Sequence, residues 1–143
     1  MTSLSTTDAD FVVKIIDVFP DDFSYTEKIK STIKDPYPMG GYEMLVRGEI
    51  MRGKFRNSFE KPEPFVPGQI TEVKWELPDV AHTFLKGHRI MIQIQSSWFP
   101  LADRNPQQFM NIYTADDSDF KKSDIKVYRD PPNSSKIIIS VLK

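Results

Sequence analysis

Cysteine is absent from the 143 residues of this sequence. Its absence excludes disulfide frameworks, thiol catalysis and cysteine-based zinc or iron–sulfur sites. It does not define the compartment, because a domain without cysteine is stable in either redox environment. An excess of charge is also lacking, since 19 basic residues stand against 20 acidic ones. Nucleic acids and anionic membranes are therefore not expected as partners, because binding to them depends on an excess of positive charge.

Long apolar runs are missing as well. No stretch approaches the roughly 18 apolar residues of a membrane span, and the N-terminal sequence MTSLSTTDADF has neither the basic start nor the apolar core of a signal peptide. We therefore expect a soluble chain, and a secreted or periplasmic location of a parent protein stays open. The length fits a single domain over residues 1–143.

Helical periodicity is scarce, and only residues 24–34 fit a short helix. There Tyr25, Ile29 and Ile33 recur every four residues, and Ser24 and Glu27 have the spacing of a capping box. Elsewhere the period of two that is typical of β-strands dominates. The predicted strands are residues 10–18, 70–77, 89–95, 109–114, 125–129 and 136–142, with a glycine-interrupted segment after residue 41. Proline and glycine loops separate them, which predicts an all-β fold, an antiparallel two-sheet sandwich.

The stretch of residues 87–107 combines a strand with an unusual loop. Ile90, Ile92 and Ile94 share one face of the strand, as in a half-buried strand. The loop contains two neighbouring aromatic residues and a polar, turn-forming cluster: Trp98, Phe99, Asp103, Arg104 and Asn105. In one interpretation the aromatic residues cap the core while Asp103 and Arg104 pair locally. In the other, the loop faces another domain or a ligand.

Residues with chemical potential are few, and none forms a catalytic constellation. There is no G-x-S-x-G nucleophile motif among the six glycines. The two histidines, His82 and His88, lack further metal ligands nearby. We therefore favour a turn hydrogen bond as the role of His82 and a position at the start of the strand for His88. We assign no catalytic, cofactor-binding or metal-binding residue.

Two groups of charged residues have both a functional and a structural interpretation. The acidic groups, Asp8 with Asp10 and the three aspartates at 116, 117 and 119, could offer oxygens to calcium, but a solvated acidic loop is favoured. The basic group consists of Arg47, Arg52, Lys54 and Arg56. It could bind an anion, but salt bridges to carboxylates on neighbouring strands are favoured.

Three segments carry a resemblance to a known family: DADFVVKIIDVFPDD, GGYEMLVRGEIMRGKFRNSFEKPEPFVPGQ and GHRIMIQIQSSWFPLADRNPQ. They resemble the C-terminal jelly-roll domain of the X-Pro dipeptidyl-peptidase and cocaine esterase family of serine hydrolases. That family includes α-amino-acid ester hydrolases and glutaryl cephalosporin acylases. The resemblance implies a jelly-roll β-sandwich that is galactose-binding-domain-like. It also implies that the chain is a C-terminal piece of an enzyme whose triad lies in an N-terminal α/β-hydrolase domain, so the chain alone should be inactive.

The resemblance also implies partners. The sandwich is expected to pack on the α/β-hydrolase domain of the parent chain and brace the active-site entrance. We place Trp98, Phe99, Asp103, Arg104 and Asn105 at that interface. Members of the family enter DADF through an earlier apolar strand, so one or more first strands are expected to be missing, which would leave an open edge for a homo-oligomer. The alternative is a free-standing jelly-roll module that binds carbohydrate or protein, with Trp75, Trp98 or Tyr113 stacking on a sugar.

Overall fold

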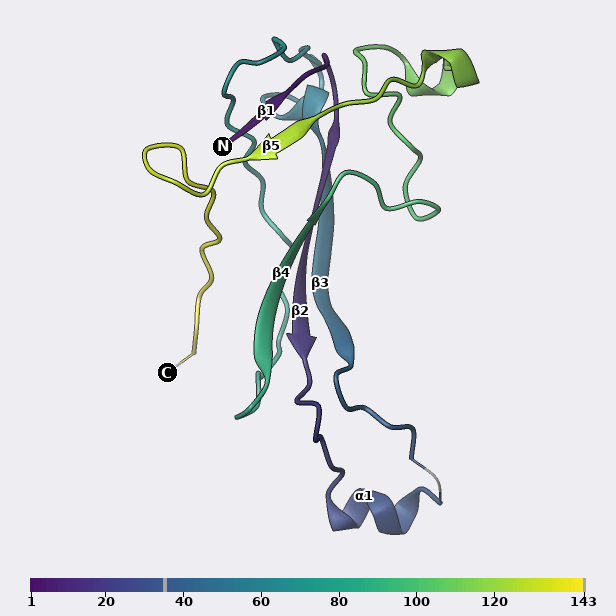
Figure 1. The fold of residues 1–143 in the computed structure, drawn as a ribbon, viewed down its shortest axis with the longest axis vertical. Coiled ribbons are helices and arrows are strands. Elements are labelled where there is room, and N and C mark those ends of the chain that lie inside the picture. The colour runs from purple at the N-terminus through teal and green to yellow at the C-terminus, as the bar shows by residue number, and fades with distance from the viewer. Residues whose placement is uncertain (35, 143) are drawn as a thin grey trace. The chain divides into compact units, whose positions relative to one another are not determined.

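The computed structural model describes residues 1–34 and 36–142, and its regular structure there is mostly strand (Figure 1). The strands are β1 (Thr2–Leu4), β2 (Asp10–Val18), β3 (Glu43–Arg52), β4 (Arg89–Gln95) and β5 (Ile125–Val127). The helices are α1 (Glu27–Thr32) and three single-turn 3-10 helices, η1 (Gly53–Phe55), η2 (Ile112–Thr114) and η3 (Asp117–Asp119). Among the described residues, no helix has the length and apolar character needed to cross a bilayer.

The strands form two sheets, which confirms the predicted all-β class. β1 pairs antiparallel with β5, in the register Thr2 with Val127 and Leu4 with Ile125. The second sheet has the order β3-β2-β4, with β2 in the centre. β2 has the predicted bounds, and its sequence DFVVKIIDV is buried except at Lys14 and Ile15. Burial of residues on both faces of β2 accounts for the apolar character of both faces of the segment.

The chain divides into two compact units. Unit 1 comprises Met1–Phe11, Ile50–Glu76 and Gln95–Lys143, and unit 2 comprises Val12–Glu49 and Leu77–Ile94. The core of unit 1 consists of Leu4, Ala9, Phe11 and Phe65, with Val73, Trp75 and Ile125 packed against it. Because β2 and β3 contribute residues to both units, the backbone that builds one unit continues into the other.

The segment of residues 70–77 is not a strand, although its predicted facing is correct. Thr71, Val73, Trp75 and Leu77 are the half-buried residues, and the residues between them are exposed. The backbone pairs with β1 at one position, where Thr2 and Thr71 exchange hydrogen bonds of 2.9 and 2.8 Å. The segment therefore shares only one bridge with β1, whereas β5 pairs with β1 at three positions.

Two other predicted strands are wrong. Residues 109–114 end in the 3-10 helix η2 instead, where the side chain of Asn111 accepts a hydrogen bond from the backbone of Tyr113. Such local side-chain bonds compete with a sheet ladder. Residues 136–142 form no strand despite their β-branched sequence, and Ile138, Val141 and Leu142 are strongly exposed. The predicted helix is confirmed but shorter, and Thr26 rather than Ser24 occupies its N-cap.

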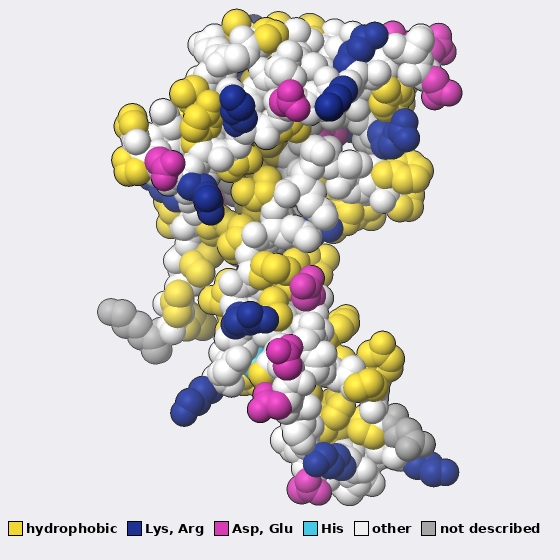
Figure 2. Space-filling model, viewed as in Figure 1, with side chains coloured by type: hydrophobic (Ala, Val, Ile, Leu, Met, Phe, Trp, Pro, Cys, Tyr) yellow, Lys and Arg dark blue, Asp and Glu magenta, His cyan; other side chains and the backbone are white. Residues whose placement is uncertain are grey.

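β4 forms over the predicted residues, but the isoleucine face, which we expected to be buried, is exposed. Ile90, Ile92 and Ile94 are exposed, whereas Met91, Gln93 and Gln95 are half-buried. Figure 2 shows that apolar side chains also reach the surface elsewhere, among scattered charges of both signs. The alternation thus identifies two faces of the strand correctly, but not which of them the described residues cover.

Candidate functional site

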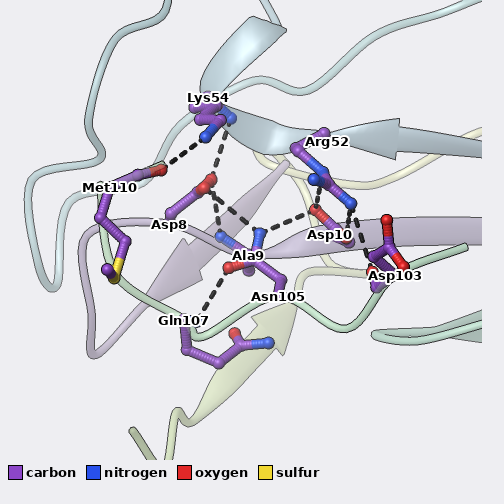
Figure 3. A network of polar contacts seen from close by, with 9 residues as sticks. All are labelled: Asp8, Ala9, Asp10, Arg52, Lys54, Asp103, Asn105, Gln107 and Met110. Atoms are coloured by element: carbon purple, nitrogen blue, oxygen red, sulfur yellow. Dashed lines mark hydrogen bonds and ion pairs between the residues drawn. The ribbon is translucent and has the colours of Figure 1, made fainter. Parts of the chain in front are cut away.

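Two buried carboxylates stand at the start of β2 and organise the polar interior of unit 1 (Figure 3). The side chain of Asp8 accepts hydrogen bonds from three donors. Its Oδ1 accepts from the backbone N–H of Ala9 at 2.9 Å and of Lys54 at 3.0 Å, and its Oδ2 accepts from the amide of Asn105 at 3.2 Å. A buried carboxylate with this many donors fixes the positions of the chains that supply them.

The second carboxylate, Asp10, is held by an amide and a guanidinium. Its Oδ1 accepts from Nδ2 of Asn105 at 2.8 Å and lies 3.4 Å from Nε of Arg52. The same guanidinium donates to the backbone carbonyl of Asp103 at 3.2 Å. Nearby, Nζ of Lys54 donates to the carbonyl of Met110 at 2.7 Å. The network therefore joins the start of β2, the end of β3 and the loop of residues 103–110.

Burial dominates the electrostatics of this network. It raises the pKa of Asp8 and of Asp10 above the ordinary value, because desolvation disfavours the charged form. The hydrogen bond from Asn105 opposes the shift at both carboxyls, and Arg52 opposes it further at Asp10. All the donors around the two carboxylates are internal, so the network acts as a support for the loop.

The supported loop presents apolar side chains at the surface. Phe99, Leu101 and Tyr113 are 66%, 73% and 82% exposed. Tyr113 lines two pockets, with volumes of about 320 and 560 Å³, and Phe99 lines the smaller one. The smaller is lined by Phe99, Asp103, Arg104, Ile112, Tyr113 and Phe120. The larger is lined by Arg52, Lys54, Phe55, Pro62 and Phe109 to Tyr113. We call this surface, from Phe99 to Tyr113 with Phe120, the loop surface.

The structure separates the five predicted interface residues into different environments. Phe99, Asp103 and Arg104 are exposed, Trp98 is half-buried, and Asn105 is buried at 5% exposure. The predicted local ion pair between Asp103 and Arg104 is not formed. Instead, the guanidinium of Arg104 lies 4.6 Å from the ring centroid of Phe120. Asn105 thus supports the loop surface from within, and the exposed residues are the ones available for a partner.

In unit 2, the two histidines share one carboxylate, a relationship that the sequence did not indicate. Asp17 is buried near the end of β2, and its two oxygens lie 2.8 Å from Nε2 of His82 and 2.8 Å from Nδ1 of His88. The ring of His88 also packs on Phe19, at 4.4 Å between centroids. Within residues 1–34 and 36–142, no cluster of His, Asp or Glu has the arrangement of a metal site. An aspartate next to apolar residues near the end of a mostly apolar strand is the signal that could have suggested such a partner.

The remaining charged candidates have structural contacts. Asp116 and Asp119 form a capping box around η3. Among the basic residues, Arg52 of β3 forms the predicted ion pair with a carboxylate on a neighbouring strand, Asp10 of β2, whereas Arg56 pairs with Glu63, which lies in a loop. Arg47 and Lys54 depart from the prediction, because both donate to backbone carbonyls. Trp75, one of the aromatic residues proposed for sugar stacking, packs against the core of unit 1, whereas Tyr113 is exposed.

Comparison with known proteins identifies relatives that are much longer than this chain. The family model of the X-Pro dipeptidyl-peptidase C-terminal non-catalytic domain matches residues 1–138. A cocaine esterase from Rhodococcus sp. (strain MB1 Bresler) is 29% identical over 141 residues, which are 99% of this chain and 21% of the esterase.

Two solved structures are similar in fold and sequence. An aminopeptidase from the marine sediment archaeon Thaumarchaeota archaeon superposes with a TM-score of 0.80 at 44% identity. A selenomethionine-labelled α-amino acid ester hydrolase superposes with a TM-score of 0.80 at 43% identity. Each match covers 92% of this chain and 20% of the other, so this chain spans about a fifth of the length of these proteins.

Proposed function

This chain belongs to the family of X-Pro dipeptidyl-peptidase C-terminal non-catalytic domains, and we propose that it packs on the α/β-hydrolase domain of a parent serine hydrolase. In that position it braces the entrance to the active site of the hydrolase domain. We assign the chain no nucleophile, because the matched family is a non-catalytic domain and the sequence contains neither a cysteine nor a G-x-S-x-G motif. Its contribution to activity is therefore structural: it holds the hydrolase domain in position at the entrance to the active site.

The observation that carries this proposal is the loop surface on its buried support. Phe99 and Tyr113 expose large apolar side chains and line the same pocket, and Leu101, two residues from Phe99 in the sequence, is 73% exposed. Contiguous exposed apolar surface marks interaction sites, because leaving it in water is unfavourable. Asn105, in turn, ties the loop to two buried carboxylates. A rigid apolar surface binds a partner with little loss of conformational entropy.

The relatives support a substrate class for the parent protein. The similar proteins are a cocaine esterase, an aminopeptidase and an α-amino acid ester hydrolase, which act on ester or amide bonds. We infer that the parent enzyme hydrolyses peptides or the esters and amides of acyl-amino compounds. An acylase belongs to the same class of hydrolases, because it also transfers an acyl group to water.

The first test is the coding sequence upstream of Met1. An in-phase reading frame that encodes a hydrolase domain with a G-x-S-x-G motif supports the proposal. An in-frame stop codon immediately upstream, with translation starting at Met1, would overturn it and would favour a free-standing binding module. In that case, glycan and protein binding would be measured next.

The second test uses the full-length enzyme. We expect the double substitution Phe99→Ser with Leu101→Ser to weaken domain packing and to raise KM for the enzyme's ester or peptide substrate. Val66→Ser is the matched control, because Val66 is also an exposed apolar residue of unit 1 but lies outside the loop surface. Wild-type KM and a wild-type unfolding profile for the double variant would count against packing through the loop surface.

A further inference from the structure

Arg104 differs from the other basic residues near the loop surface. Arg52 is paired with Asp10 and Lys54 donates to the carbonyl of Met110, so both charges are used within unit 1. Arg104 is exposed, and across the described part of the chain its guanidinium forms no ion pair with a carboxylate. It lies instead against the face of Phe120.

This contact prepares Arg104 for binding an anion. A guanidinium stacked on an aromatic ring is attracted by the negative face of the ring and keeps its planar fork in one orientation. The five N–H donors of that fork match a carboxylate in a bidentate arrangement. Because the side chain is already ordered, less rotamer entropy is lost when the carboxylate arrives.

The pocket beside Arg104 adds a place for an apolar side chain. Its lining includes Phe99, Ile112, Tyr113 and Phe120, with a volume of about 320 Å³. Asp103 also lines the pocket, and its carboxylate forms no ion pair within residues 1–34 and 36–142. An anion that enters at Arg104 must therefore be accompanied by a donor that faces Asp103. Aromatic residues and arginine around a pocket are the composition of interface hot spots.

We infer that Arg104 is the carboxylate-binding anchor of the domain interface. The occupant of the pocket is a segment of the parent's hydrolase domain in which an aspartate or glutamate neighbours an apolar side chain and a hydrogen-bond donor that faces Asp103. The apolar side chain fills the pocket, and the acid pairs with Arg104. This inference rests on the proposed function, since it names the chemistry by which the hydrolase domain is recognised. The occupant lies in a part of the protein that corresponds to the region of the relatives that this chain does not match.

The experiment is hydrogen exchange of the full-length enzyme, followed by mass spectrometry of peptides from residues 99–113. If docking protects these amides, their exchange rate reports the undocked fraction. We expect Arg104→Glu to raise that rate about tenfold, the effect of losing roughly 1.4 kcal/mol of docking free energy. Arg104→Lys keeps the charge but loses the planar fork, so a smaller increase is expected. High salt should reduce the difference between wild type and Arg104→Glu.

The control is Arg129→Glu, the same charge reversal at an exposed arginine of unit 1 that lines neither pocket. It should leave exchange in residues 99–113 unchanged. Peptides from β2 report whether each variant is folded. If Arg104→Glu raises exchange there, the milder Arg104→Gln replaces it, with an increase at residues 99–113 alone as the expected result.

The outcomes separate this inference from the proposed function. Wild-type exchange in the Arg104 variants, combined with faster exchange in the Phe99→Ser and Leu101→Ser double variant, would mean that docking is apolar only. That result overturns the carboxylate anchor and leaves the proposed function standing. Wild-type exchange in all of these variants would overturn both.

Discussion

Nδ2 of Asn105 donates a hydrogen bond of 2.8 Å to Oδ1 of Asp10, and the two residues are 95 positions apart in the sequence. The same nitrogen donates to Asp8 at 3.2 Å. One amide group thus uses both of its hydrogens on two buried carboxylates, while its oxygen accepts from the backbone N–H of Gln107 at 2.8 Å. An apolar or acidic side chain could not supply these two donors.

Replacing Asn105 by alanine should therefore destabilise the protein. Two buried carboxylate oxygens would lose a donor, and leaving a buried acceptor unsatisfied costs about 1 to 3 kcal/mol. We expect Asn105→Ala to lower the free energy of unfolding by about 3 kcal/mol, as measured by urea denaturation. Asn57→Ala is the matched control, because Asn57 donates to the carboxylate of Glu63 at the surface. A loss in Asn105→Ala no larger than in the control would contradict the structural role of the network.

The raised pKa of Asp10 predicts how stability changes with pH. A carboxyl whose pKa is higher in the folded state binds more protons there than in the unfolded chain, at pH values between the ordinary 3.8 and the folded value. The free energy of unfolding therefore increases as pH falls through this window. Wild type should gain stability relative to Asp10→Asn on acidification, measured by urea denaturation at several pH values. The exposed Asp22→Asn serves as control. A free energy of unfolding of wild type minus that of Asp10→Asn that falls or stays constant toward acid would refute the assignment.

The carboxylate of Asp17 should contribute to stability through two unequal partners. His88 is the more buried of the histidines, with its side chain 4% exposed against 20% for His82, and it also packs on Phe19. We expect His88→Ala to lower the free energy of unfolding by about 2 kcal/mol and His82→Ala by about 1 kcal/mol, because hydrogen bonds to charged groups contribute most where water is excluded. Thermal and urea unfolding of the two variants measure the difference. Equal effects, or a larger one for His82→Ala, would argue against the larger contribution of the more buried His88.

Local sequence patterns were sufficient for several elements of the fold. β2 is a short, mostly apolar run and β4 alternates with a period of two, and the structure forms both strands. β1 was missed, because the three residues Thr2–Leu4 form a strand only through their pairing with β5. The facing of β4 was predicted wrongly for a related reason. Alternation defines two faces, but the neighbours that cover one of them come from elsewhere in the chain.

The sequence was sufficient to predict which residues belong to the candidate site, but not which of them are buried. The aromatic and charged content of the loop indicated Phe99 and Arg104, which the structure places at the surface beside a pocket. Burial of Asn105 could not be foreseen, since its partners Asp8 and Asp10 are remote in sequence. The DAD sequence at the start of an apolar strand was the available signal, because buried acids need donors. It indicates a need for donors without indicating which residue supplies them.

Gly53 gives the sharpest steric prediction. A Cβ atom added there would lie 2.6 Å from the carbonyl oxygen of Ala9 and 2.6 Å from a ring carbon of Phe65, closer than real Cβ atoms approach their neighbours. The backbone is fixed at this point, because the N–H of Gly53 donates to that same carbonyl at 2.8 Å. Relief would require moving the start of β2 or the core ring of Phe65. We expect Gly53→Ala to lower the free energy of unfolding by about 3 kcal/mol, at the upper end of the cost of overpacking.

Gly87→Ala separates this steric effect from the general cost of replacing a glycine. Gly87 has a φ of +90°, and an added Cβ there would meet no atom within 4 Å. Its replacement should cost about 1 kcal/mol, from backbone strain alone. Denaturant midpoints of the two variants give the comparison. Suppose that Gly53→Ala lowered the free energy of unfolding no more than Gly87→Ala. The end of β3 and the start of β2 could then not be packed as closely as the hydrogen bond between Gly53 and Ala9 requires. The buried support of the loop surface would also have to be looser than the contacts of Asn105 indicate.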